Sequence, residues 1–161
     1  MGGVWKKLPY TWILMLIGTL ALTGFPFLSG FYSKDAIIEF AYLSGNTTQY
    51  FAAVIGIFTA FLTAIYSWRL FFKTFHDTYN NKNLNFGKIH ESSIVMIVPL
   101  IILAIGAIFS GFLFKDLFIG TESSSIFWKN SILFLEPFTH GHPPLWVIIT
   151  TPILVILSIP T

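Results

Sequence analysis

The sequence predicts an all-α, polytopic transmembrane helical bundle, because apolar residues dominate it and gather in four long stretches. Of its 161 residues, 55% are hydrophobic and only 10% are charged, and the mean hydropathy is +0.76. These values lie outside the usual range of soluble domains. A bilayer core about 30 Å thick requires roughly 20 mostly apolar residues per helix. About four membrane spans are therefore predicted in a single membrane-embedded segment, at residues 8–43, 50–72, 92–114 and 145–160.

The first predicted span is too long for one straight helix. Residues 8–43 would extend for about 54 Å at 1.5 Å per residue, which is nearly twice the hydrocarbon thickness. Pro26 removes a backbone donor and clashes with the preceding turn, while Gly24 and Gly30 permit backbone angles that other residues resist. We therefore expect the helix to be interrupted around Gly24 to Gly30. In lipid, the backbone groups freed by such a break must face protein or a wet cavity.

A charged pair follows the predicted break. Ser33 is expected to cap the second helical piece, with Asp35 in its first turn and Lys34 held beside the break. Residues 8–32 are also long enough to cross a membrane alone, and the charged pair would then mark the exit at the outer surface, with residues 36–43 along the interface. Composition leaves both alternatives open. A lysine near the bilayer centre costs roughly 2.5–3.5 kcal/mol, so the buried alternative requires a functional reason.

The distribution of basic residues predicts that the N-terminus of this segment is cytoplasmic. Basic residues precede the first span and gather around the end of the second and the loop after it, and an even number of crossings places both groups on the same side. These residues are Lys6, Lys7, Arg69, Lys73, Lys82 and Lys88. The two remaining loops are uncharged or hold more acidic than basic residues, as expected for the opposite side.

Redox cofactors, metals and nucleotides have no predicted site in this chain. The absence of cysteine from the sequence excludes disulfides and cysteine-ligated iron–sulfur clusters. The four histidines fall at or beyond the span ends, and the pair His140 and His142 has no third metal ligand in a clear pattern. No glycine-rich phosphate loop is present either. We expect no cofactor or metal here, so the electrons of any redox reaction would travel elsewhere.

Three segments carry a resemblance to a known family. They are "MGGVWKKLP" at residues 1–9, "LTGFPFLSGFYSKDAIIE" at residues 22–39 and "AFLTAIYSWRLFFKTFH" at residues 60–76. In order and separation they resemble NADH dehydrogenase subunit 5, called subunit L in bacteria, the antiporter-like membrane subunit of respiratory complex I. The resemblance implies a C-terminal-half fragment of a larger subunit. We accordingly expect that Met1 is not the subunit's true start and that the chain is cut within its last hydrophobic span.

The resemblance implies a function that composition does not show. It implies a proton-translocating subunit of NADH:quinone oxidoreductase, a translocase whose redox chemistry is performed by other subunits. NADH, FMN, iron–sulfur clusters and quinone would then belong to those subunits, and this fragment would not pump alone. The implied partners are the other membrane subunits of the complex, the lipid bilayer and protons, without nucleic acid. A bacterial inner membrane is the expected location, and the mitochondrial inner membrane is the alternative.

The resemblance also assigns a role to Lys34. In the family, the helix with this motif is interrupted near the membrane middle, and its lysine belongs to a central chain of charged residues linked to proton translocation. Carried over by motif, that lysine is Lys34, and Asp35 is a candidate partner. Desolvation disfavours the charged form of an amine, and a nearby carboxylate opposes this effect. A lysine under these opposed influences takes up and releases a proton as neighbouring charges change.

Other polar residues are weaker candidates for a proton path. Glu39 lies four residues after Asp35, so two like charges would share one helix face. Thr59, Thr63 and Tyr66 lie on one broad face of the second span, together with basic residues near its end. These residues either line a water path, or the threonines bond to their own helix while the basic residues reach the interface.

Two other functions remain open from the sequence. The large subunits of multisubunit sodium–proton antiporters are related to the same family and also use a charged, interrupted helix. A structural membrane anchor, in which Lys34 only marks an interface, is the third alternative. The residues of the motif "GFPFLSGFYSKD" resemble the complex I subunit more than the antiporter subunit.

Overall fold

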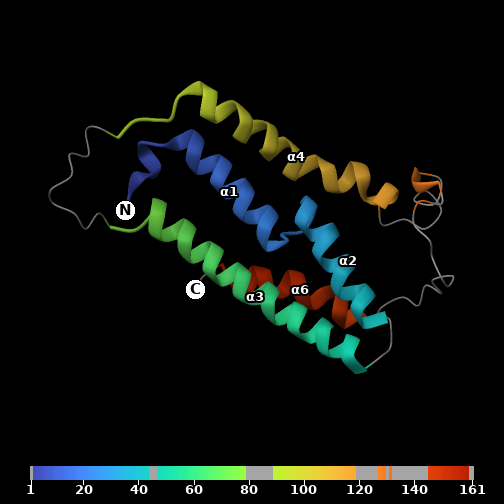
Figure 1. Ribbon diagram of the computed structural model, residues 1–161. Coiled ribbons are helices and arrows are strands. Elements are labelled where there is room, and N and C mark those ends of the chain that lie inside the picture. The colour runs from blue at the N-terminus through green and yellow to red at the C-terminus, as the bar shows by residue number, and fades with distance from the viewer. Residues whose placement is uncertain are drawn as a thin grey trace.

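A computed structural model describes residues 2–43, 47–78, 89–118, 127–129, 131 and 145–159. Within these ranges a short 3-10 helix, η1, precedes five α-helices (Figure 1). The elements are η1 (Val4–Lys6), α1 (Pro9–Thr23), α2 (Ser29–Leu43), α3 (Thr47–Phe75), α4 (Ile94–Phe118) and α6 (Leu145–Leu157). The prediction of an all-α helical bundle is confirmed.

The second and third predicted spans each form one long helix. With 29 and 25 residues, α3 and α4 are about 44 and 38 Å long. Both are apolar and long enough to cross a membrane. The prediction for the third span stopped at residue 114, because Lys115 and Asp116 were assigned to the following loop. The structure places both in the last turn of α4.

The first predicted span forms two short helices. α1 and α2 have 15 residues each, so each is about 22 Å long and too short to cross the bilayer core alone. They follow one another nearly end to end, and together they run beside α3 on one side and α4 on the other (Figure 1). α6, a shorter apolar helix, packs against α3 and α2. The end of the fourth predicted span, residue 160, lies outside the described residues.

The gap between α1 and α2 lies opposite the middle of α3. On the α2 side, Ile38 approaches α3 so closely that a Cβ added at Gly56 would lie 3.3 Å from its side chain. On the α1 side, Leu20 packs against the buried cluster that includes Trp68. Gly56 and Trp68 are each about two turns or more from the nearer end of α3. The interruption is therefore at the centre of the bundle, which supports a buried break over an exit at the surface.

Aromatic side chains hold the two ends of the bundle. At one end, Trp12 of α1 donates a hydrogen bond from Nε1 to Nε2 of His76, at 3.1 Å. At the other end, the ring of Tyr42 lies 5.1 Å from that of Tyr50 and 5.5 Å from that of Trp146, which connects α2 with α3 and α6. Amphipathic rings at span ends are typical of membrane proteins. These contacts fix the outer ends of α1 and α2, which lie far from the break and do not contact each other.

Helix α4 approaches the break through a glycine. A Cβ added at Gly111 would lie 2.6 Å from the Cα of Ser29 and 2.6 Å from the ring of Tyr32. Small residues allow helix backbones to approach closely in membranes. The start of α2 is therefore set against α4 at a distance that only glycine permits.

Candidate functional site

The break begins with a glycine in the left-handed conformation. Gly24 has φ +83° and follows the last residue of α1. Its N–H donates to the carbonyl of Ala21 at 3.3 Å, and the N–H of Phe25 donates to the carbonyl of Leu20 at 3.0 Å. This pair of bonds is the Schellman arrangement that ends many helices. It satisfies two of the carbonyls that the end of α1 leaves without a partner.

The break is shorter than the sequence predicted. Pro26 lies inside it, but α2 already begins at Ser29, so Gly30 is part of this helix. Gly30 serves close packing instead, since a Cβ there would lie 1.8 Å from the carbonyl oxygen of Ala21.

The predictions that Ser33 caps the second piece and that Asp35 occupies its first turn are wrong. The helix starts four residues before Ser33. Phe27, which follows Pro26, has φ +73°, and the chain then returns to helical hydrogen bonding from Leu28, whose carbonyl accepts from the N–H of Phe31. The Ser33 hydroxyl donates within the helix, to the carbonyl of Ser29 at 3.4 Å.

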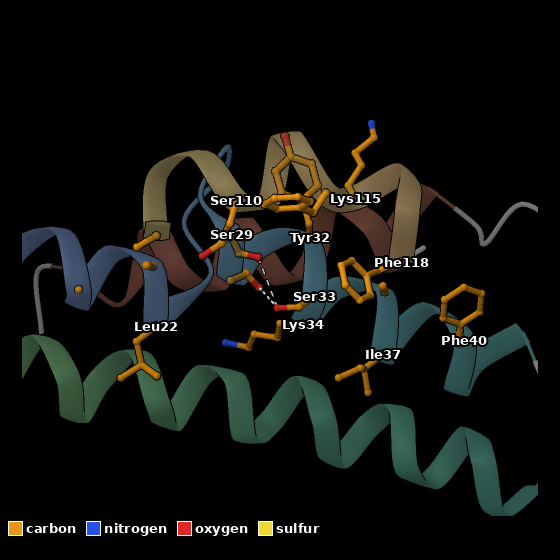
Figure 2. A pocket seen from close by; sticks show the side chains of 17 residues that line it. Leu22, Ser29, Tyr32, Ser33, Lys34, Ile37, Phe40, Ser110, Lys115 and Phe118 are labelled. Atoms are coloured by element: carbon orange, nitrogen blue, oxygen red, sulfur yellow. Dashed lines mark hydrogen bonds between the residues drawn. The ribbon is translucent and has the colours of Figure 1, made fainter. Parts of the chain in front are cut away.

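Lys34 supplies a partner for the end of α1. Its Nζ lies 3.0 Å from the carbonyl oxygen of Thr23, the last residue of that helix. The side chain is half-buried, and in Figure 2 it extends along the bundle toward α1. A carbonyl at a helix C-terminus has no intrahelical partner and carries the negative end of the helix dipole. The structure therefore places Lys34 beside the break, as predicted. The carbonyl of Thr23, which the break leaves without an intrahelical partner, accepts its hydrogen bond.

A groove of about 1010 Å³ opens beside Lys34 (Figure 2). Residues of α1, α2 and α4 line it, and most of them are apolar or small. Lys34 and Ser33 bring polar atoms to it from α2, and Ser110 does so from α4. The break thus adjoins a hollow in the described part of the chain that is mostly apolar and holds a few polar side chains, Lys34 among them.

Asp35 faces different surroundings from Lys34. Its side chain is only 7% exposed, and Thr151 of α6 hydrogen-bonds to the carboxylate. The second oxygen, Oδ2, is buried without a hydrogen-bond partner among the described residues. Adjacent residues of a helix point in different directions, so Asp35 faces α6 while Lys34 reaches back to α1. Thr151 is not predicted from the sequence, where its one signal is a polar pair, Thr150 and Thr151, in the last apolar stretch.

The weaker candidates divide into two groups. Glu39 is half-buried and lines a small cavity together with Asp35. Thr59 and Thr63 donate to carbonyls of their own helix, at 2.8 and 2.7 Å, and Tyr66 is 57% exposed. None of these three α3 residues lines the groove or the cavity near the break.

The histidine pair of the sequence analysis, His140 and His142, lies outside the described residues. Among those that are described, no group of three His, Asp or Glu side chains is placed to hold a metal ion.

Two family profiles match the chain. The first, described as "NADH:quinone oxidoreductase/Mrp antiporter, TM", matches residues 1–63 and so includes the break and Lys34. The second, described as "NADH dehydrogenase subunit 5 C-terminus", matches residues 66–139. The second profile favours the complex I subunit over the sodium–proton antiporter subunit.

Proteins named NADH-ubiquinone oxidoreductase chain 5 are similar to most of this chain. The one from Marchantia polymorpha is 46% identical over 135 residues, which are 84% of this chain and 20% of the relative. Those from Chondrus crispus and Dictyostelium citrinum are each 47% identical over 140 residues, covering 84% and 87% of this chain and 21% and 20% of the relatives. The chain thus spans about one fifth of the length of these relatives. It belongs to the NADH dehydrogenase subunit 5 family, the antiporter-like membrane subunits of NADH:quinone oxidoreductase.

Proposed function

We propose that this chain is part of a proton-translocating membrane subunit of NADH:quinone oxidoreductase, with Lys34 as a proton relay. The observation that carries the proposal is the contact between Nζ of Lys34 and the carbonyl oxygen of Thr23, at 3.0 Å, in a break opposite the middle of α3. An ionisable side chain at membrane depth is costly and is usually retained for function. Here the bundle also provides a specific partner for it.

Two opposed influences act on the Lys34 ammonium. Removal from water disfavours its charge, while the free carbonyl and the negative end of the α1 dipole favour it. Because these effects oppose one another, a modest change in nearby charge shifts the balance between the protonated and neutral lysine. Redox chemistry in other subunits would provide such a change, and the lysine would then take up a proton in one state and release it in the other.

The proposal extends to the rest of the complex. NADH, FMN, iron–sulfur clusters and quinone would be bound by other subunits, and the partners of this chain would be the neighbouring membrane subunits, lipid and the transported protons. The relatives come from organisms such as Marchantia polymorpha and Chondrus crispus, which favours the mitochondrial inner membrane over the bacterial one. The basic residues near the start of α1 and the end of α3 would face the matrix, the compartment that corresponds to the cytoplasm of a bacterium.

The test is replacement of Lys34 in the full-length subunit of the assembled complex. Lys34→Ala should strongly reduce NADH-driven acidification of vesicles, whereas Lys34→Arg should keep part of it because the positive charge is retained. Lys6→Ala is the matched control, since Lys6 is an exposed lysine at the end of the bundle. A fully assembled Lys34→Ala complex that pumps as the wild type does would refute the relay and leave the anchor role.

A further inference from the structure

A second cavity lies on the other side of α2. It has a volume of about 380 Å³ and is lined by residues of α2, α4 and α6. Four of these residues are charged: Asp35 and Glu39 from α2, and Lys115 and Asp116 from the last turn of α4. A volume of this size has room for several water molecules, and polar walls are the condition for holding them. The cavity connects the buried Asp35 with the exposed end of α4.

The charges around this cavity do not cancel. Asp35, Glu39 and Asp116 supply three carboxylates, and among the described residues Lys115 is the only basic one in the lining. Asp35 and Glu39 are four residues apart on one helix, where like charges repel each other. The Oδ2 atom of Asp35 is buried without a partner in the described part of the chain. Thr151 hydrogen-bonds to the Asp35 carboxylate, but the carboxylates still outnumber the basic groups around the cavity. Because a net negative charge away from water is unfavourable, a proton or a nearby cation would be stabilised there.

Lys115 is shared by the two hollows. It lines the groove beside Lys34 as well as the cavity beside Asp35, and no other charged residue in the described ranges lines both. Its Nζ lies 5.8 Å from the centre of the Tyr32 ring, and Tyr32 also lines both hollows. Figure 2 shows Lys115 beside Tyr32, with its side chain extending away from Lys34. A lysine side chain is long and flexible, so Lys115 can place its charge toward either hollow.

We propose that Lys115 is a further positioning residue of the proton path, which offsets the negative charge of the cavity formed by Asp35, Glu39 and Asp116. This inference rests on the proposed function of Lys34. A proton released by Lys34 would pass through water to a carboxylate of the cavity, which forms an O–H bond and later returns the proton to water near the end of α4. With Lys115 present, the carboxylates hold the proton weakly enough to release it. Without Lys115 they would retain it.

The test removes the charge of Lys115 and then restores the balance by a second change. In the assembled complex, Lys115→Met and Lys115→Gln should each slow vesicle acidification by about tenfold, the effect of one uncompensated charge at a partly screened site. Lys115→Arg should stay within about twofold of the wild type. Lys115→Met combined with Glu39→Gln should recover most of the loss, because the pair of changes restores the net charge. A role of Lys115 in packing alone would not produce this recovery.

Lys129→Met is the matched control, because it removes another exposed lysine that lines neither hollow. Lys115 is itself exposed at the end of α4, so its replacement removes no packed side chain and assembly should be unaffected. Wild-type pumping by Lys115→Met, together with loss of pumping by Lys34→Ala, would overturn the inference and leave the proposed function standing. Failure of the double change to recover pumping would also overturn it. Wild-type pumping by Lys34→Ala would instead refute the proposed function itself.

Discussion

The Nζ atom of Lys34 lies 3.0 Å from the carbonyl oxygen of Thr23, so the second helix of a broken span provides the cap for the first. The Schellman bonds satisfy the carbonyls of Leu20 and Ala21, and the lysine satisfies a third. The same contact that closes the helix end also places an ammonium group at the centre of the bundle. Structure and proposed function therefore depend on the same residues.

Gly24→Ala should disturb this contact. The residue has φ +83°, and an added Cβ would lie 3.4 Å from Cδ and 3.8 Å from Nζ of Lys34. The left-handed conformation alone costs roughly 1–2 kcal/mol for a residue other than glycine. We expect lower thermal stability of the solubilised complex together with slower proton pumping. Gly18→Ala is the control, because a Cβ there meets nothing within 4 Å, and equal behaviour of the two variants would show that the break tolerates a side chain at Gly24.

Gly111→Ala should separate α4 from the start of α2. The added Cβ would lie 2.6 Å from the Cα of Ser29, a backbone atom that cannot move aside alone. Overpacking of this kind typically costs about 1–3 kcal/mol. The expected result is a lower midpoint of thermal denaturation for the solubilised complex. Gly106→Ala lies on the same helix with open space around its Cβ and should leave the midpoint unchanged; a drop of the same size in both variants would contradict the packing described here.

Labelling of introduced cysteines tests the depth of the break. The sequence of this chain holds no cysteine, so mass spectrometry of the peptides around positions 33 and 49 can follow single cysteines introduced at Ser33 and Gln49. Gln49 is in the first turn of α3, at the end of the bundle, whereas Ser33 is in the second turn of α2, just beyond the break. A membrane-impermeant maleimide should label position 33 far more slowly than position 49. Equal rates would support the exit at the outer surface.

Sequence patterns predicted the helices well because membrane spans depend on length and hydropathy, both of which are local. The break was found because Pro26 and Gly24 act on their own backbone. Its boundary was missed, because the sequence does not show that helical hydrogen bonding already resumes at Leu28 and Phe31, before Ser33. The partners of the charged pair could not be predicted, because Thr23 and Thr151 become neighbours of α2 only through packing.

The position of Lys115 could not be predicted from the sequence either, because it also depends on packing between helices. Lys115 and Asp116 follow an apolar stretch, a pattern typical of the start of a loop, and the third predicted span therefore stopped at residue 114. Only the packing of α4 against α2 shows that Lys115 and Asp116 continue the helix and approach Asp35 and Glu39. Hydropathy contains no information about such a cavity, because it does not record which helices become neighbours.

The most direct test of the relay is the number of protons moved per NADH oxidised by the complete complex with Lys34→Met. Methionine keeps much of the length of the side chain but can neither bind a proton nor donate to the Thr23 carbonyl. The measurement compares proton uptake or release with NADH consumption in the same vesicles, so slower electron transfer alone does not change the ratio. We predict a ratio below that of the wild type in a fully assembled complex. An unchanged ratio would contradict the role of Lys34 in carrying protons.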